Sequence, residues 1–540
     1  MKKILLLLVF LAASYGVSAM QPQPDLDSAI GSLFAIPIPV HVSHESVEEI
    51  CQFINQHHIG AVLVDRVGTI DQQVALINTI LRLCPHKPLI LQDLEWGLTM
   101  RLTDGIRFPH ALTCGAIQNQ ELINRMAQEI GRQVKLLGVD VALQPVFDLN
   151  TNPRNPVIGD RSFGQFPERV TQALRAYLSG LESQQVADCA KHFPNHGPTC
   201  EDSHCTLAIN PHDIEQLQNV DLHPYKQLIP TGLVRCVMPA HMHVPALDNQ
   251  PNRSATLSYA IVTELLRKQL GFNGVIIADA LRMGALIKYF DTATITLEAF
   301  NAGNDILLAP ADMIAAIQAL KKAVQNGSIS ADEVRLRAER INQQLRMFTH
   351  VDQKKLIDPT TIKKQLETPE AYALKKELYT AAITLVRDRN TIIPITTPTQ
   401  TAVITMGSKP ENSFVNALQA QYTGIPTYHI PAQPNGMEIN ELQTQLRDYG
   451  TIIIGVFDIN KRDYTRFGLS DDGIDFIRQL SKTKRVILTI FGSPYSLALF
   501  ADIPTIIMAY EDDPDAQEAA AHAVTGKLTP TGTLPVEIPA

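Results

Sequence analysis

Residues 185–204 have the sequence QVADCAKHFPNHGPTCEDSH. The first six residues form a β-type run, and the fourteen that follow hold one lysine, three histidines and the pair Asp202 and His204. Enzymes built on β/α barrels and doubly wound sheets carry their catalytic groups on loops that leave the strands. An imidazole beside a carboxylate can transfer protons near neutral pH. The stretch therefore predicts a catalytic loop, whereas His192 or His196 taken alone would be interpreted as a hydrogen-bonded loop histidine.

The alternation of a β-type run with a helical stretch extends from Ser32 to about Asp312. Most of the eight runs end in a polar or charged residue: 33–39, 61–65, 88–95, 139–148, 185–192, 234–241, 274–281 and 305–310. The stretches between them, such as 119–137 and 168–184, show helical periodicity. The pattern predicts an α/β fold, a (β/α)8 TIM-type barrel over residues 29–350 with its chemistry at the carboxyl ends of the strands. A doubly wound sheet would alternate in the same way and is the alternative.

Residues 379–540 contain a second series of β-type runs. These are 382–387, 401–406, 451–457, 485–491 and 505–510. Because the runs are rich in valine and isoleucine, we expect a parallel sheet covered on both faces, which makes a C-terminal α/β sandwich domain. Residues 351–378 are predicted to be a polar linker followed by a helix that begins at Pro369. A chain of 540 residues is long enough for two or three such domains.

The N-terminal residues have the pattern of a secretory signal. Two lysines precede the apolar run 4–13, and residues 17–19 (VSA) are small enough for cleavage. We therefore predict a signal peptide over residues 1–19 and a mature chain that starts near Met20. The mature protein would be exported, periplasmic or secreted, without stable membrane insertion. An uncleaved anchor is the alternative.

Export would expose the seven cysteines to an oxidising environment. Cys200 and Cys205 bracket the pair formed by Asp202 and His204. If the cysteines pair, a Cys200–Cys205 disulfide that tightens this loop is our first expectation. Buried or free thiols are the alternative.

The composition limits the class of function. Hydrophobic residues make up 45% and charged residues 19% of the chain, as is typical of a soluble globular enzyme. A formal net charge of −9 without a basic run argues against a nucleic-acid partner. No CxxC pair offers closely spaced metal ligands, and we predict neither a metal nor another cofactor. The oligomeric state is not indicated.

The segment Lys191–His204 closely resembles the signature KHFPGHGxTxxDSH of the β-N-acetylglucosaminidase branch of glycoside hydrolase family 3. It departs from the signature at Asn195, where the family has glycine. Asparagine tolerates a left-handed backbone, so we expect the loop to keep its shape. Other segments resemble family motifs in the expected order: 93–101 resembles DQEGGRVQR, 155–163 NPVIGDRSF, 238–241 MTAH, 279–283 the nucleophile motif TDALxM, and 532–536 the GxLPV end of two-domain members.

The resemblance implies a retaining glycosidase and assigns roles to three residues. Retention needs a nucleophile against the anomeric carbon and an acid/base at the leaving oxygen. By resemblance, Asp279 is the nucleophile, His204 is the acid/base, and Asp202 is the partner that orients the imidazole. Without the resemblance, Asp279 would be interpreted as a helix cap and Asp202 as a turn residue.

The resemblance also implies a set of residues that bind N-acetylglucosamine. These are Asp93, Arg101, Arg161, Lys191 and His192. Trp96 stands where the family has glycine, and it either stacks on a sugar or peptide or fills a gap. The strand that ends at His241 is expected to line the site.

The function predicted in this way is that of a retaining exo-β-N-acetylglucosaminidase, a β-N-acetylhexosaminidase. It would remove terminal β-linked N-acetylglucosamine from cell-wall (peptidoglycan) fragments or related oligosaccharides through a covalent glycosyl-enzyme. The alternatives are a phosphorylase on the same scaffold, a metal-dependent barrel hydrolase that uses histidines such as His241 and His243, and a non-catalytic cell-wall sugar-binding protein. We expect the second domain to be structural or to gate access of the substrate.

Overall fold

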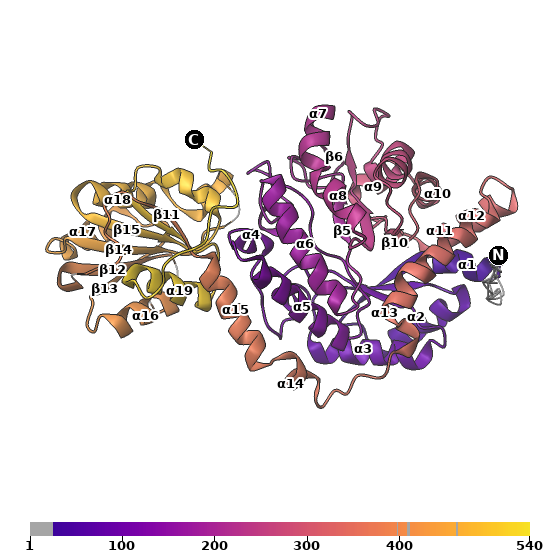
Figure 1. The fold of residues 1–540 in the computed structure, drawn as a ribbon, viewed down its shortest axis with the longest axis horizontal. Helices are drawn as coiled ribbons and strands as arrows, with labels where there is room; N and C mark the ends of the chain where they lie inside the picture. Colours follow the sequence, from indigo (N-terminus) through magenta and orange to yellow (C-terminus); the bar gives the residue numbers. More distant parts are fainter. Residues whose placement is uncertain (1–24, 397, 408–410, 461–462, 540) are drawn as a thin grey trace, which may run out of the picture.

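The computed structural model describes residues 25–396, 398–407, 411–460 and 463–539 of the chain. Two α/β domains lie side by side, and helices α14 (Ile362–Leu366) and α15 (Pro369–Ala382) connect them (Figure 1). The predicted signal peptide lies outside these ranges. Within them, no helix combines the length and the apolar character needed to cross a membrane.

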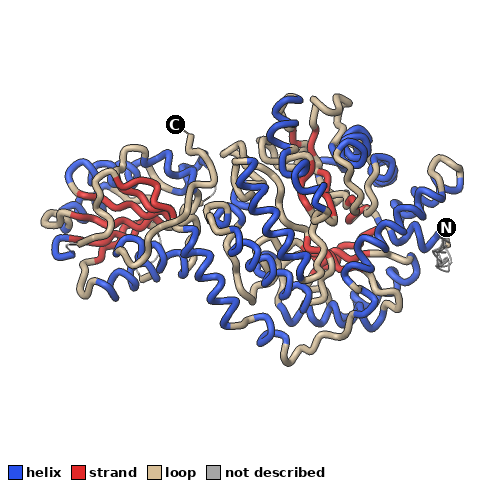
Figure 2. Tube along the Cα trace, viewed as in Figure 1, coloured by secondary structure: helices blue, strands red, loops and turns tan. Residues whose placement is uncertain are grey.

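The first domain contains eight parallel strands where the sequence predicts them. They are β1 (Phe34–Pro39), β2 (Ala61–Asp65), β3 (Leu89–Gln92), β4 (Val141–Ala142), β5 (Ala190–Phe193), β7 (Cys236–Pro239), β9 (Val275–Ile276) and β10 (Leu307–Leu308). They form two arcs, β10-β1-β2-β3-β4 and β5-β7-β9. Isolated parallel bridges join the arcs at both seams: Val141 with Ala187, Val146 with Lys191, and Ile277 with Ile306. The predicted α/β barrel is therefore confirmed, with helices outside the strands (Figure 2).

Amphipathic helices alternate with these strands. The longer ones are α2 (His44–His57), α3 (Ile70–Leu83), α5 (Gln120–Leu136), α6 (Pro167–Ser183), η6 (Ala260–Gln269), α10 (Thr292–Ala302), α11 (Met313–Gln325) and α12 (Ala331–Ile341). In α5, Ile123, Met126 and Ile130 are buried, and their spacing places them on one face of the helix. The hydroxyl of Thr69 accepts a hydrogen bond from Gln72 N–H at the start of α3, which fixes where the chain turns from loop to helix.

The second domain is a six-stranded sheet with the order β11-β16-β15-β14-β12-β13. Its strands are β11 (Thr384–Asp388), β12 (Thr401–Met406), β13 (Thr427–Ile430), β14 (Thr451–Val456), β15 (Arg485–Ile490) and β16 (Thr505–Met508). Only β11 is antiparallel to its neighbour. The edge strand β13 was not predicted, because its side chains are mostly polar and partly exposed.

Helices cover both faces of this sheet, as the sequence predicts. Ile453 and Ile487 belong to the core beneath α16 (Ser413–Gln421) and α19 (Pro514–Thr525). Their neighbours in the chain, such as Ile452, belong to the other core, which contains residues of α17 (Gly436–Gln445) and α18 (Asp471–Thr483). Successive residues of a strand point to opposite faces, so an unbroken apolar run is what a sheet between two helical layers requires.

The closing GTLPV segment packs against the barrel. Gln165 N–H donates to Pro535 O at 3.0 Å, and Thr533 N–H donates to Ala116 O at 3.0 Å. Gly164 has φ +137°, and a Cβ at this position would lie 2.3 Å from Pro535 O. Glycine at 164 therefore allows the close approach that ties the end of the chain to the first domain.

Candidate active site

Five charged side chains form one network at the carboxyl ends of β3 and β5. Lys191 Nζ lies 2.7 Å from Asp93 Oδ1 and 2.8 Å from Glu95 Oε1. Arg101 donates to the other oxygen of Asp93 at 2.8 Å, and Arg161 donates to both oxygens of Glu95 at 2.8 and 2.7 Å. Four predicted sugar-binding residues are thus brought together. Glu95 joins them, although its only signal was the glutamate that segment 93–101 shares with DQEGGRVQR.

The charges of this network hold one another ionised. Burial by itself raises the pKa of Asp93, but Lys191 and Arg101 outweigh it and lower the pKa to about 2. Burial likewise opposes ionisation of Glu95, whose pKa is nevertheless lowered by Arg161 and Lys191. Three cations against two carboxylates leave one net positive charge. The result is a fixed array of charged donors and acceptors that suits the hydroxyl groups of a sugar.

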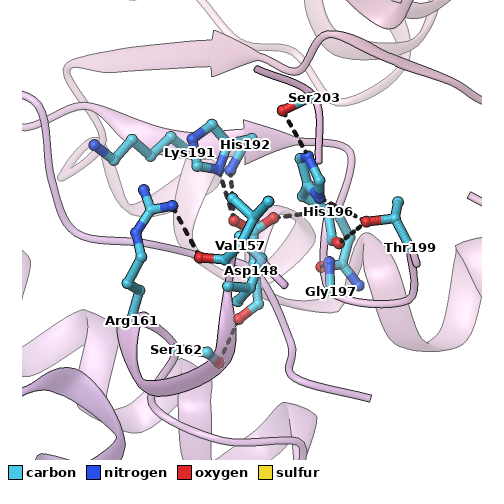
Figure 3. A network of polar contacts seen from close by, with 12 residues as sticks. Asp148, Val157, Arg161, Ser162, Lys191, His192, His196, Gly197, Thr199 and Ser203 are labelled. Atoms are coloured by element: carbon cyan, nitrogen blue, oxygen red, sulfur yellow. Dashed lines mark hydrogen bonds and ion pairs between the residues drawn. The ribbon is translucent and has the colours of Figure 1, made fainter. Parts of the chain in front are cut away.

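Asp148 is fully buried and holds two histidines (Figure 3). One carboxylate oxygen accepts from the backbone N–H of His192 at 3.2 Å and from its Nδ1 at 2.8 Å. The other oxygen accepts from the backbone N–H of His196 at 2.6 Å. Because Nδ1 of His192 is bound to the carboxylate, Nε2 is the ring nitrogen that can meet a ligand. Asp148 ended the fourth predicted strand run and was given no role there.

The imidazole of His196 fastens the loop that leaves β5 (Figure 3). Its Nδ1 lies 2.8 Å from Thr199 Oγ1, and its Nε2 lies 3.0 Å from Ser203 Oγ. Burial, together with the charge of His192, lowers the pKa of His196 to about 4. His196 is therefore a neutral, hydrogen-bonded loop histidine, and it positions the segment Asp202-Ser203-His204.

Asn195, which stands where the family motif has glycine, stabilises the loop through its side chain. Its backbone is not left-handed. Its Oδ1 accepts from Leu149 N–H at 3.0 Å and from Gly197 N–H at 2.9 Å, and its Nδ2 donates to Asp221 at 2.8 Å. The tolerance of asparagine for a left-handed backbone is therefore not used here, and three hydrogen bonds of the side-chain amide account for the residue.

Asp202 and His204 form the predicted pair on the surface of the loop. Asp202 Oδ1 lies 2.8 Å from His204 Nδ1 and accepts the backbone N–H of the same residue at 2.9 Å. The side chain of His204 is 64% exposed. Gly284 N–H donates to His204 O at 3.1 Å, which ties the loop to the segment after Asp279. With Nδ1 bound to Asp202, Nε2 is the nitrogen that can exchange a proton with a substrate.

Asp279 follows β9 and is only partly exposed. Burial acts to raise the pKa of this carboxyl group, but the charges of His241, His192 and His204 outweigh burial and lower the pKa. Asp279 is therefore ionised at neutral pH, as a nucleophile must be. His192 and His204 are thus close enough to Asp279 for their charges to affect its carboxyl group.

His241, between β7 and β8 (Met242–His243), and His243 of β8 bond to protein groups. His241 lies 2.8 Å from Thr256 Oγ1 and 3.0 Å from Ala280 O through its two ring nitrogens, and His243 Nδ1 lies 3.0 Å from Arg253 O. Over the residues that the structure describes, no three His, Cys, Asp or Glu side chains are grouped as metal ligands.

The cysteines are all free thiols, and all seven lie in the described ranges. The structure therefore has the alternative, buried or free thiols, and the conditional Cys200–Cys205 disulfide is not formed in it. Cys200 Sγ lies 3.2 Å from Asn152 Nδ2, and Cys205 N–H donates to Asp202 O in a turn. The turn and the Asn152 contact hold the loop without a covalent link.

A cavity of about 510 Å³ lies between the two domains beside Arg161. Side chains of the barrel and of the second domain line it, among them Trp96, Arg107, Arg154, Tyr495, Tyr510 and Asp512. The ring of Trp96 packs against His110, with centroids 4.5 Å apart. Trp96 therefore both fills space in the protein and borders a cavity that could hold a ligand.

Comparison with known proteins identifies the family. Residues 26–344, more than half of the chain, match the Glycosyl hydrolase family 3 N terminal domain. The chain belongs to glycosyl hydrolase family 3. It is 34% identical to Beta-hexosaminidase A of Pseudoalteromonas piscicida over 283 residues, which are 48% of this chain and less than half (47%) of that protein. It is 32% identical to a Beta-hexosaminidase of Nitrosomonas eutropha over 286 residues, 51% of this chain and 81% of that protein.

A solved structure extends the similarity over both domains. The family 3 β-N-acetylglucosaminidase from Paenibacillus sp. str. FPU-7 superposes with a TM-score of 0.79 at 27% identity, covering 95% of this chain and 99% of that chain. The resemblance seen in the motifs and the two-domain α/β architecture are both confirmed. As a member of family 3, the protein is a glycoside hydrolase.

We predict that Lys191→Met lowers the free energy of unfolding at pH 7 by about 3–5 kcal/mol, because it leaves Asp93 and Glu95 buried without their shared cation. Chemical denaturation measures this difference. The pKa of Asp93 is lower in the folded than in the unfolded protein, where it is about 4. The folded protein therefore gains stability from Asp93 above about pH 4, and it loses this stability as the pH falls towards the folded pKa. The pKa values of both carboxyl groups rise in the variant, so its deficit should shrink below about pH 4.

Lys376→Met is the matched control. Lys376 is half-exposed and pairs with Glu518 at 2.8 Å, so we expect a loss of less than about 1 kcal/mol. Equal losses in the two variants would contradict the role given to the buried network.

Proposed function

We propose that this family 3 protein is a retaining exo-β-N-acetylglucosaminidase. The observation that carries the proposal is the Asp202–His204 contact of 2.8 Å on a loop tied to the Asp279 segment. A proton donor with its own carboxylate partner and an ionised carboxylate are the two groups that retaining hydrolysis needs. The names of the bacterial relatives, β-hexosaminidase and β-N-acetylglucosaminidase, support N-acetylglucosamine as the sugar.

The buried charge network would bind the non-reducing sugar. Asp93, Arg161 and Lys191 offer paired donors and acceptors to hydroxyl groups, and Arg101 and His192 flank them. Since these side chains already hold each other in place, little side-chain entropy is lost when the sugar binds. Their burial favours a site closed at one end, which suits removal of a terminal sugar.

The reaction would proceed in two steps at this sugar. Asp279 attacks the anomeric carbon and forms a covalent glycosyl-enzyme, while His204 Nε2 donates its proton to the leaving oxygen. His204 then removes a proton from water, which attacks the same carbon and releases the sugar with retained configuration. Asp202 holds Nδ1–H throughout, so the imidazole keeps its orientation and its positive charge is stabilised when it is protonated.

We further propose that the protein acts outside the cytoplasm on cell-wall fragments. The lysines, apolar run and small residues of segment 1–19 support export. N-terminal analysis of the protein from the periplasm or the medium should give a chain that starts near Met20. Recovery of intact residues 1–19 on a cytoplasmic protein would contradict export.

We expect the enzyme to prefer β-N-acetylglucosaminides over β-glucosides by well over tenfold in kcat/KM, which is more than about 1.4 kcal/mol of transition-state binding. Release of nitrophenol from the two aryl glycosides measures the ratio. Equal rates would contradict the assignment of the sugar. The assay is run with and without phosphate, since phosphate-dependent formation of a sugar phosphate would identify a phosphorylase instead.

Two variants separate the steps of the mechanism. Asp279→Ala should lose activity on every substrate, because no leaving group replaces a nucleophile. His204→Ala should lose far more activity on disaccharides than on aryl glycosides, whose departure needs little protonation, and glycosyl-enzyme should accumulate on the latter. Mass spectrometry of the intact protein detects the adduct.

Asp202→Ala is the graded comparison, and we expect it to resemble His204→Ala in a milder form, since it removes only the orienting group. Disaccharide hydrolysis near the wild-type rate in His204→Ala would show that another group is the acid/base.

A further inference from the structure

Glu511 of the second domain faces the barrel from the carboxyl end of the C-terminal sheet. It follows β16, and the residue before it, Tyr510, has a left-handed backbone with φ +65°. An aromatic residue rarely adopts this conformation, and such strain persists where the surroundings demand it. Both residues line the interdomain cavity that Arg161 also borders. Glu511 is therefore held in a defined place next to the proposed sugar site.

One carboxylate accepts hydrogen bonds from several groups of the first domain. Glu511 Oε1 accepts from His110 N–H at 2.8 Å and from Thr113 Oγ1 at 2.6 Å. Oε2 lies 2.8 Å from His110 Nδ1 and accepts from Arg107 at 3.1 Å. Tyr379 Oη of α15 donates to the same oxygen at 3.3 Å. With both oxygens occupied, this carboxylate is a structural acceptor.

The electrostatics agree with this geometry. Burial opposes ionisation of Glu511, but His110, Thr113 and Arg107 outweigh burial and lower the pKa of the carboxyl group to about 2. The side chain is only 9% exposed. A group that stays ionised and enclosed cannot supply the proton for a leaving sugar, so its contribution must come through the residues that it holds.

His110 connects Glu511 with the residues next to Glu95 and Arg161 in the chain. The imidazole packs on Trp96, the residue after Glu95, with centroids 4.5 Å apart. Its Nε2 lies 3.6 Å from Asp160 Oδ2, and Asp160 precedes Arg161. Glu511 fixes the orientation of His110 through Nδ1, and His110 then contacts the immediate neighbours of the two charges that form a bidentate pair.

We propose that Glu511 is a positioning residue of the sugar site, through which the second domain holds Arg161 and Glu95 in place by way of His110. The inference rests on the proposed function, because it assigns the effect to binding of the sugar. It gives the C-terminal domain a part in substrate affinity without a part in proton transfer. Loss of the charge at 511 should therefore weaken binding and leave the chemical steps largely intact.

The test compares Glu511→Gln, which keeps the shape of the side chain and removes its charge, with Glu377→Gln. Glu377 of α15 pairs with Arg125 of the barrel at 2.9 Å on the exposed side of the domain contact, away from the cavity. On an aryl N-acetyl-β-glucosaminide we expect Glu511→Gln to raise KM about tenfold with kcat within about threefold of wild type. Glu377→Gln should have wild-type KM and kcat.

The variant His110→Phe, in the barrel, tests independently whether Glu511 affects sugar binding through His110. It keeps a ring against Trp96 and removes the polar contacts of the imidazole, among them those with Glu511 and Asp160, so KM should rise as in Glu511→Gln even if the latter does not fold. Wild-type KM in His110→Phe or in folded Glu511→Gln, a loss confined to kcat, or an equal rise of KM in Glu377→Gln would each overturn the proposal. If the wild-type protein itself does not turn over N-acetylglucosaminides, the proposed function fails instead.

Discussion

A single buried ammonium group sets the geometry of this family 3 site. Lys191 bridges Asp93 and Glu95 at 2.7 and 2.8 Å, and the two carboxylates in turn bind Arg101 and Arg161. Each buried ion loses several kcal/mol of hydration, and only close, well-aligned partners offset that loss. A shift of any one of these five groups would leave another charge unpaired. The ends of β3 and β5 and the loop before α6 are therefore held in register by electrostatics.

The catalytic pair is built in the opposite way. Asp202 and His204 are exposed and bond mainly to each other, whereas the base of their loop is fastened by His196 and Asp148 in the protein interior. A rigid base with an exposed tip allows the proton donor to meet a bound sugar while the loop keeps its path. The buried residues that would orient the sugar are rigidly held, whereas His204, which would protonate the leaving group, is accessible to it.

The two domains meet at the same kind of edge. The barrel contributes Trp96 from the carboxyl end of β3, and the second domain contributes Tyr510 and Glu511 from the carboxyl end of β16. In parallel sheets this end carries the loops that hold ligands. When two such ends face each other, backbone and side-chain groups that water would otherwise solvate form hydrogen bonds with each other. The carboxylate of Glu511 accepts such hydrogen bonds from the barrel across the interface.

The sequence by itself determined the architecture and the family. Buried parallel strands are continuous apolar runs, and such runs located all eight barrel strands and the four buried parallel strands β12, β14, β15 and β16 of the second sheet. The apolar start of the antiparallel strand β11 was located in the same way. The polar edge strand β13 lacks this apolar pattern and was not predicted. The motif 191–204 likewise identified the loop and its Asp202–His204 pair, because partners two residues apart are visible in one segment.

Tertiary structure alone decided which groups those residues meet. Glu95 and Arg161 are 66 residues apart, Asp148 and His192 are 44 apart, and His110 and Glu511 are 401 apart. A sequence segment carries no information about a partner that only chain folding brings within 3 Å. The hydrogen bond from Leu149 N–H to Asn195 Oδ1 likewise joins residues 46 positions apart, and it does not follow from local spacing.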